Sequence, residues 1–353
     1  MGDQLDDGLH AGQHVNRQCG GDIAAHRARG LLILLLVILS VHVTPLRAAT
    51  LIGADTPSHR VTFAFHSAFL MNLHHFLFDM AVHPDKLAQV AWSSPPTPDE
   101  MRTLSSAVAY YRVHYGKLGI RDDPALVAIK RALSVIDARR DAANLGLAPA
   151  LAAVLGDVAP VYARTLWARD DASNQTWIGG VERLDALHGA AIQAGIEQQL
   201  SAPFPDTPIR VDVVFDTGSR QGAYTDEQTV MPSSRGDYQS LASIEMLYHE
   251  ASHTTVTAPL ERAIAARLRA TSRDEDSDLW HAVQFYTVGF VTGDVLARHG
   301  LPGYRPYADK RGLYAGYWAI YMPAINGGWA DYLAGKTGLM QAVDTMVDAL
   351  PAP

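Results

Sequence analysis

The chain has 353 residues, of which 48% are hydrophobic and 19% are charged, and this composition predicts a folded globular protein. The formal net charge is −8 at pH 7, which argues against a phosphate-binding surface and excludes nucleic acid as an expected partner. The only cysteine, Cys19, stands near the N-terminus. A metal site in the rest of the chain would therefore use histidine or carboxylate ligands and no thiolate.

An apolar segment near the N-terminus indicates export. Arg29 is followed by roughly 13 apolar residues from Leu31, and small residues stand at Ala48 and Ala49. The apolar core is shorter than the roughly 20 residues of a membrane-spanning helix. We therefore expect residues 1–48 to be a signal peptide cleaved near Ala48, and the mature chain to be periplasmic or secreted without a stable membrane span. An uncleaved membrane anchor is the alternative.

Residues 49–200 have the pattern of a mainly helical N-terminal region. The segment 61–82 is apolar on nearly every side, which predicts a buried helix. After a linker at 93–98, Asp99 is expected to cap an amphipathic helix. Helical periodicity then continues to Leu200.

The pattern changes in residues 201–353. Short alternating runs from Ile209, split by Gly, Pro and Asp, indicate strands and turns. A helix is then expected from about Tyr238 to Val256 and another from Asp278, before a region rich in Tyr, Trp and Gly. The expected fold class is therefore mainly α with a small β-sheet (α+β), in which short strands precede the helix at 238–256.

The sequence HEASH, from His249 to His253, carries the strongest functional signal. Histidines four residues apart lie on one face of a helix, where both can bind a single tetrahedral Zn²⁺ ion. Glu250 lies about 100° around the helix from His249, so it can serve as general base toward a zinc-activated water and then as general acid. The pattern fits the H-E-x-x-H zinc hydrolases, and a chain of this composition would contain it by chance only about 0.015 times. We therefore favour a metal site over a pair of core histidines.

With this motif the sequence resembles the zincin metallopeptidases, over about Ile209 to His299. The resemblance implies a peptidase with one zinc ion per chain and an edge strand before the active-site helix that pairs with an extended substrate. Pro259 stands where the metzincin class has its third histidine. The resemblance is therefore to the gluzincin topology, in which a following helix supplies the third ligand. The segment WHAVQFYTVGF also resembles secreted bacterial proteins of unassigned function that carry HExxH.

The third ligand is where this sequence departs from the gluzincin pattern. A glutamate ligand would have to be Glu261, which is too close to the motif to fold back onto the metal, or Glu275, which lies in a charged loop. His281 is preferred, because it stands near the start of an apolar helix where a polar residue needs a reason. Asp278 and Asp294 stay open as alternatives.

Supporting roles are expected for residues on either side of the metal ligands. Tyr314 and Tyr317 are candidates for stabilising the oxyanion during peptide hydrolysis. Glu245, one turn before His249, either accepts a hydrogen bond from a ligand histidine or faces solvent. Asp237 is expected to cap the active-site helix.

These observations together predict an exported hydrolase that acts on a peptide or protein substrate. One zinc ion would be held by His249, His253 and His281, with Glu250 as general base. Two alternatives stay open. One is an envelope metal-binding or scaffold protein that keeps the helix without catalysis, and the other is a zinc hydrolase of a non-peptide amide such as cell-wall material.

Overall fold

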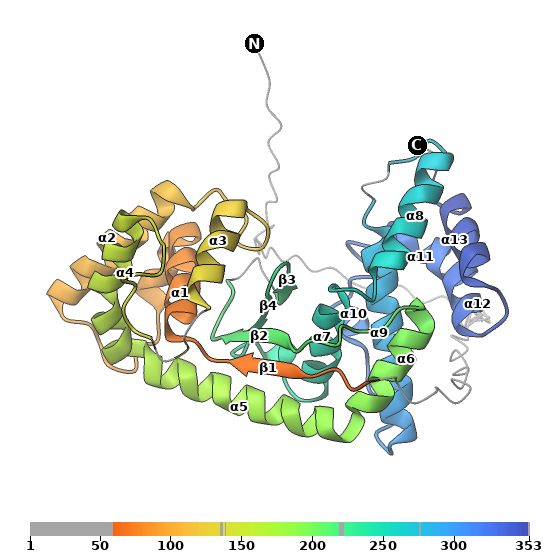
Figure 1. Cartoon of the computed structure of the whole chain (residues 1–353), viewed down its shortest axis with the longest axis horizontal. Helices are drawn as coiled ribbons and strands as arrows, with labels where there is room; N and C mark the ends of the chain where they lie inside the picture. Colours follow the sequence, from red (N-terminus) through yellow and green to blue (C-terminus); the bar gives the residue numbers. More distant parts are fainter. Residues whose placement is uncertain (1–58, 135–136, 138, 219–221, 275–276, 352–353) are drawn as a thin grey trace, which may run out of the picture. The chain divides into compact units, whose positions relative to one another are not determined.

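The computed structural model describes residues 59–134, 137, 139–218, 222–274 and 277–351. The expected signal peptide, Cys19 and Glu275 lie outside these residues. Within them the fold is 62% helical with one small four-stranded mixed sheet, which confirms the expected fold class (Figure 1).

The first helices form a group that packs around its own hydrophobic core. They are α1 (Phe69–Val82), η1 (Pro84–Gln89), α2 (Pro98–His114), α3 (Pro124–Leu133) and α4 (Pro149–Tyr162). The N-cap of α2 is Thr97 and not the expected Asp99. Thr97 and Glu100 form a reciprocal capping box, while Pro98 takes the first helical position and Asp99 the next.

The apolar segment 61–82 is not one helix, as its composition suggested. It divides into strand β1 (Phe63–His66) and helix α1. Strand β1 pairs in parallel with β2 (Ile209–Val214), a partner far along the chain. Local periodicity cannot report such a pairing, and it overrides the helical pattern of the first part of the segment.

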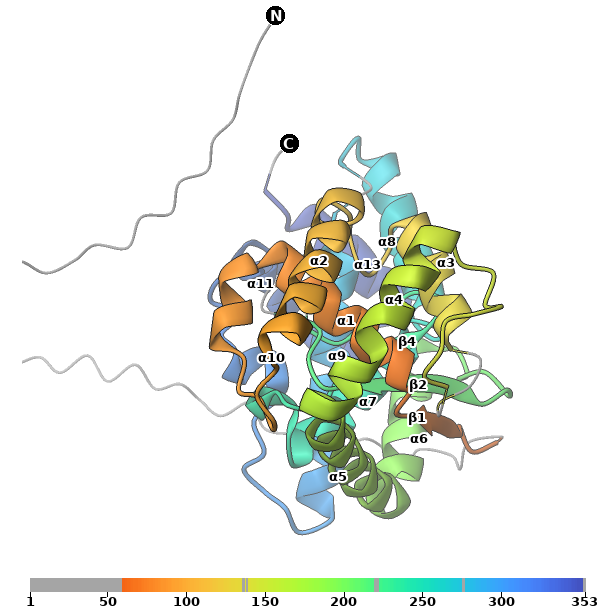
Figure 2. The ribbon, with the colours of Figure 1, turned by 90° about the vertical axis from the view of Figure 1, so that its left-hand side faces the viewer.

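A continuous helical run leads from α4 to the sheet. It consists of η2 (Ala163–Trp167), α5 (Ala168–Leu184), η3 (Asp185–Gly189) and α6 (Ala190–Leu200), and η2 and η3 are π-helical turns. In Figures 1 and 2, α5 runs beneath the strands.

The sheet has the strand order β1-β2-β4-β3, with β4 at Thr229–Pro232 and β3 at Tyr224–Thr225. β1, β2 and β4 are parallel, whereas β3 is an antiparallel edge strand. Successive side chains point to opposite faces. Val213 of β2 therefore packs into the core of the C-terminal helices, and Val214 into the core of α1–α4. The sheet thus separates two hydrophobic cores, and residues of α5 and α6 belong to the core of the C-terminal helices.

The remaining elements follow the strands. They are η4 (Gly236–Tyr238), α7 (Leu241–Ser252), α8 (Ala258–Ala270), α9 (Leu279–Arg298), α10 (Tyr307–Lys310), η5 (Ala319–Tyr321), α11 (Met322–Ala324), η6 (Ile325–Trp329), α12 (Ala330–Leu333) and α13 (Leu339–Asp348). The HEASH helix is α7, and its N-cap is Ser240. Asp237 does not cap it, because its carboxylate pairs with Arg235 at 2.9 Å.

Among the described helices, none combines the length and apolar character that crossing a membrane requires.

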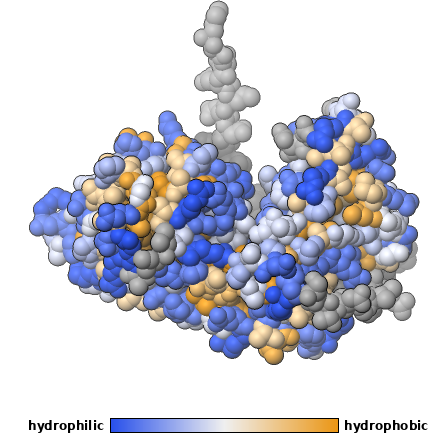
Figure 3. Space-filling model, viewed as in Figure 1, coloured by the Kyte–Doolittle hydropathy of each residue, from blue (hydrophilic) through white to orange (hydrophobic). Residues whose placement is uncertain are grey.

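The surface in Figure 3 is hollowed between the α1–α4 helices and the group around α8 and α11. Helices α3 and α8 stand on opposite sides of this hollow in Figure 1 and overlap in the perpendicular view of Figure 2.

Candidate metal centre

Three histidines from two helices converge at one point. His249 and His253 come from the last turn of α7 and its C-cap, and His281 comes from the first turn of α9. One ring nitrogen from each histidine lies within 4.8 Å of the other two, and the cluster can hold a metal ion. His253 keeps helical backbone angles just beyond the end of α7, so the i, i+4 spacing is preserved. The pairing of His281 with the motif agrees with the sequence-based choice.

The spacing of the imidazoles fits a tetrahedral ion. The Nε2 atoms of His249 and His253 are 3.3 Å apart. Two nitrogens at Zn–N distances of about 2.0–2.1 Å and a tetrahedral angle would be about 3.3–3.4 Å apart. Burial lowers the pKa of both side chains, that of His253 to about 3, and the neighbouring imidazoles add to the effect. The neutral form that binds metals is therefore favoured.

Asp278 orients His281 and is not itself part of the histidine cluster. Its Oδ1 atom lies 3.4 Å from Nδ1 of His281, and its Oδ2 atom accepts a hydrogen bond of 2.7 Å from Nε1 of Trp318. Burial opposes the ionisation of Asp278, but the hydrogen bonds from His281 and Trp318 outweigh it and hold its pKa below the usual value. A carboxylate on Nδ1 leaves Nε2 of His281 for the metal, as in many metal sites of proteins.

Aromatic and amide side chains of α9 hold the motif in place. The ring of Phe285 stacks on His249 at a centroid distance of 3.6 Å, and Trp280 stacks on His281 at 5.1 Å. Nε2 of Gln284 donates to the carbonyl of His249 at 3.0 Å and to Oγ of Ser252 at 2.7 Å. Gln284 therefore fixes the C-terminal end of α7 to α9.

Glu250 faces the edge strand of the sheet. Oγ1 of Thr225, on β3, lies 3.0 Å from Oε2 of Glu250 and donates to it. Burial raises the pKa of Glu250 to about 8, against the opposing effects of the Thr225 hydrogen bond and the positive charge of Arg121. Glu250 thus lies beside an antiparallel edge strand, at the place where the resemblance implies one.

Glu245 has neither of the two roles expected for it. It is fully buried and accepts hydrogen bonds from the Tyr304 hydroxyl and, at 3.0 Å, from the backbone N–H of Tyr307. Burial raises its pKa to about 7. Glu245 therefore ties the 304–307 segment to α7, and it does not support a ligand histidine.

The two tyrosines proposed to stabilise the oxyanion are linked to the histidine cluster through the ring of Trp318. Trp318 contacts His281 at a centroid distance of 5.3 Å, and Tyr314 and Tyr317 contact Trp318 at 6.1 and 5.8 Å. Tyr317 is 75% exposed, whereas the hydroxyl of Tyr314 is buried and has no hydrogen-bond partner among the described residues. Their catalytic role stays a prediction.

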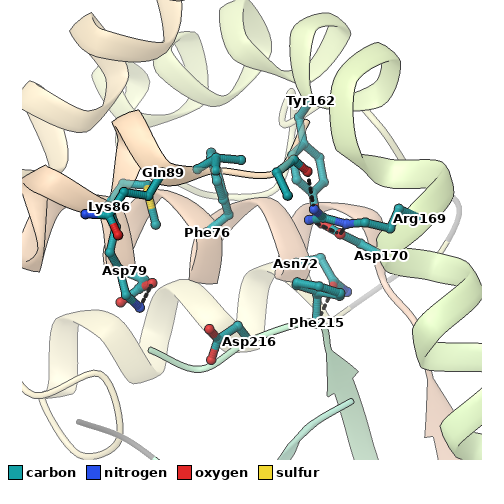
Figure 4. Close-up of a pocket in the computed structure, with 13 residues that line it drawn as sticks. Asn72, Phe76, Asp79, Lys86, Gln89, Tyr162, Arg169, Asp170, Phe215 and Asp216 are labelled. Atoms are coloured by element: carbon teal, nitrogen blue, oxygen red, sulfur yellow. Dashed lines mark hydrogen bonds and ion pairs between the residues drawn. The ribbon is translucent and has the colours of Figure 1, made fainter. Parts of the chain in front are cut away.

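A cavity of about 360 Å³ lies elsewhere, among α1, η1 and the residues after β2 (Figure 4). Asn72, Phe76 and Phe215 are among its lining residues, and none of the three histidines is. Its buried carboxylates are paired inside the protein, Asp79 with Lys86 at 2.6 Å and Asp170 with Arg169 at 2.6 Å. The cavity is therefore separate from the metal centre.

The sequence analysis did not predict how several residues support the three histidines, and it considered Asp278 only as an alternative ligand. Asp278 stands three residues before His281 on the same helix, so its pairing role could have been read from that spacing. Thr225 and Trp318 come from distant segments, and no local pattern marks them.

Comparison with known proteins adds no relative. No family model matches the chain, and the searches of curated proteins and of solved structures found no match.

Proposed function

We propose that this protein is a zinc-dependent hydrolase, most simply a peptidase of the zincin type. The observation that carries the proposal is the convergence of His249, His253 and His281 beside Glu250, with an antiparallel edge strand next to that carboxylate. Three imidazole ligands suit Zn²⁺ better than Mg²⁺ or Ca²⁺, which prefer oxygen ligands. We also propose that the protein is exported, as the N-terminal segment indicates.

The chain's own residues would divide the chemistry between them. A zinc ion held by the triad would lower the pKa of water to near 7 and polarise the scissile carbonyl. Glu250 would take the proton from the attacking water and deliver it to the leaving amine. Thr225 would hold the Glu250 carboxylate by its hydrogen bond, and the edge strand β3 would align an extended peptide through main-chain hydrogen bonds.

Elemental analysis of the purified full chain tests the metal first. We expect about one zinc ion per chain, lost in His281→Ala and retained in Glu250→Gln. The matched control is Glu261→Gln, a carboxylate on the exposed face of α8 that should change neither zinc content nor activity. Loss of zinc in Glu250→Gln would mean that Glu250 is a ligand, and the proposed mechanism would be wrong.

Activity is the second test. Casein and peptidoglycan are offered to the wild-type protein and to Glu250→Gln, and the products are identified. Cleavage of casein by the wild type alone supports a peptidase, and cleavage of peptidoglycan alone supports a hydrolase of cell-wall amides. Bound zinc without hydrolysis of either would favour a metal-binding or scaffold protein.

A further inference from the structure

The cavity among α1, η1 and the residues after β2 has the size of a small-molecule site. Its volume of about 360 Å³ falls within the range of roughly 300–1,000 Å³ that is usual for such sites. Gln89 and Ala91 line the cavity and are themselves exposed, so it opens to solvent beside η1. A small molecule can therefore enter it.

Apolar side chains form much of the cavity wall. Phe76 and Met80 come from α1, Val90 follows η1, and Phe215 follows β2. Phe76, Val90 and Phe215 are only partly buried, so the protein leaves part of their surface uncovered. The guanidinium carbon of Arg169 lies 4.2 Å from the ring centre of Phe215, which shows that this wall accepts a positive charge beside it. The wall thus suits a ligand with a hydrocarbon body.

The charged groups that line the cavity do not balance. They are three carboxylates and two cations, Asp79, Asp170, Asp216, Lys86 and Arg169. Lys86 pairs with Asp79, and Arg169 pairs with Asp170, both at 2.6 Å. In Figure 4 these two pairs lie on opposite sides of the cavity, and Asp216 stands between them with no dashed line drawn to it. One negative charge of the lining is therefore left over.

Asp216 belongs to the turn after β2 and keeps one carboxylate oxygen for a ligand. Its Oδ1 atom accepts a hydrogen bond of 3.0 Å from the backbone N–H of Gly218. Within the described part of the chain, no cation pairs with this carboxylate. The residue is only partly exposed. A cationic donor is the partner that such a carboxylate binds most strongly, because charge-assisted hydrogen bonds are stronger than neutral ones.

We infer that this cavity binds a small organic ammonium ion, with its charge at Asp216 and its apolar body against Phe76 and Phe215. The cation would balance the charge of the lining, and its hydrocarbon part would cover the exposed apolar surface. An anion would meet an unpaired carboxylate, and a neutral ligand would leave that carboxylate without a charged partner. The inference does not depend on the metal centre, because none of the three histidines lines the cavity.

Calorimetric titration of the full chain with two matched pairs of ligands tests this inference. The first pair is benzylamine and benzyl alcohol, and the second is cyclohexylmethylamine and cyclohexylmethanol. Both amines are protonated at pH 7, so each pair differs in charge at nearly constant shape. We expect each ammonium ion to bind the wild type at least about tenfold more tightly than its alcohol.

Three variants decide whether the binding takes place in the cavity. Asp216→Asn should reduce the affinity for each amine to that for its alcohol, and asparagine keeps an oxygen that can accept from Gly218, so the turn is preserved. Val90→Phe should weaken the binding of all four ligands, because the larger ring fills the cavity. Asp157→Asn is the matched control, since Asp157 is an exposed aspartate of α4 that does not line the cavity, and it should bind like the wild type.

The outcomes separate this inference from the proposed hydrolase function. Equal affinities within both pairs, a preference that survives Asp216→Asn, or binding that persists in Val90→Phe would overturn it. Failure of both amines to bind at millimolar concentration would overturn it as well. A metal chelator should leave the affinities unchanged, and loss of binding on chelation would place the amines at the metal centre instead.

Discussion

Replacing Asp278 by Asn should weaken zinc binding without removing any ligand. The carboxylate accepts from two donors at once, Nδ1 of His281 and Nε1 of Trp318. Asparagine offers one oxygen and one NH₂ group, so one of the two donors would face another donor. His281 would then lose its negatively charged partner or its fixed ring orientation.

The size of the effect follows from this geometry. Loss of a carboxylate partner of a ligand histidine typically weakens metal binding by about 10- to 100-fold, or about 1.4–2.8 kcal/mol. The Asp278 side chain is 32% exposed and its contact to His281 is 3.4 Å long, so water can replace part of the interaction. We therefore expect about tenfold weaker binding, at the lower end of that range.

Competition with a zinc chelator at pH 7 measures this change. Asp294→Asn is the matched control, because Asp294 lies on the same helix, pairs with Arg298 at 2.9 Å and was itself a candidate ligand. We expect the control to bind zinc like the wild type. The reasoning would be refuted by unchanged zinc affinity in Asp278→Asn, or by an equal loss in Asp294→Asn.

Three further predictions concern buried groups. Burial raises the pKa of Glu245 from 4.5 to about 7, so the protonated side chain favours the folded state and stability should fall by about 3 kcal/mol as the pH rises through that interval. Because the pKa of Glu250 is also raised, the loss between pH 5 and pH 8 in urea unfolding should be smaller by about this amount in Glu245→Gln than in the wild type, and equal losses in the two proteins would contradict it. Thr225→Val removes a donor to Glu250 and should lower kcat about 10-fold or more with zinc content unchanged, so full activity in this variant would argue against the hydrogen bond. Trp329 is fully buried and donates to Thr287 at 2.8 Å, so Trp329→Ala should lower the free energy of unfolding by roughly 3–5 kcal/mol in urea titration, and a cost below about 1 kcal/mol would show that the site collapses.

The features that could be predicted from the sequence are those that depend on local spacing. The i, i+4 histidines of α7 and the apolar stripe of α9 are properties of single helices. They were therefore readable in HEASH and around His281, and the structure brings these three histidines together. The helical content, the three strands from Ile209 and the mainly α class follow from patterns of the same kind.

Tertiary structure alone decided what depends on contacts between distant segments. β1 is a strand because β2 lies beside it, although residues 61–82 have the composition of a helix. Glu245 is buried because the 304–307 segment covers it, and the second oxygen of Asp278 accepts from Trp318, which comes from a distant segment. Lys130 contacts the ring of Tyr224 only because the sheet places α3 beside β3. In each case the free energy comes from a partner far away in the chain, and no pattern within one segment records where that partner will lie.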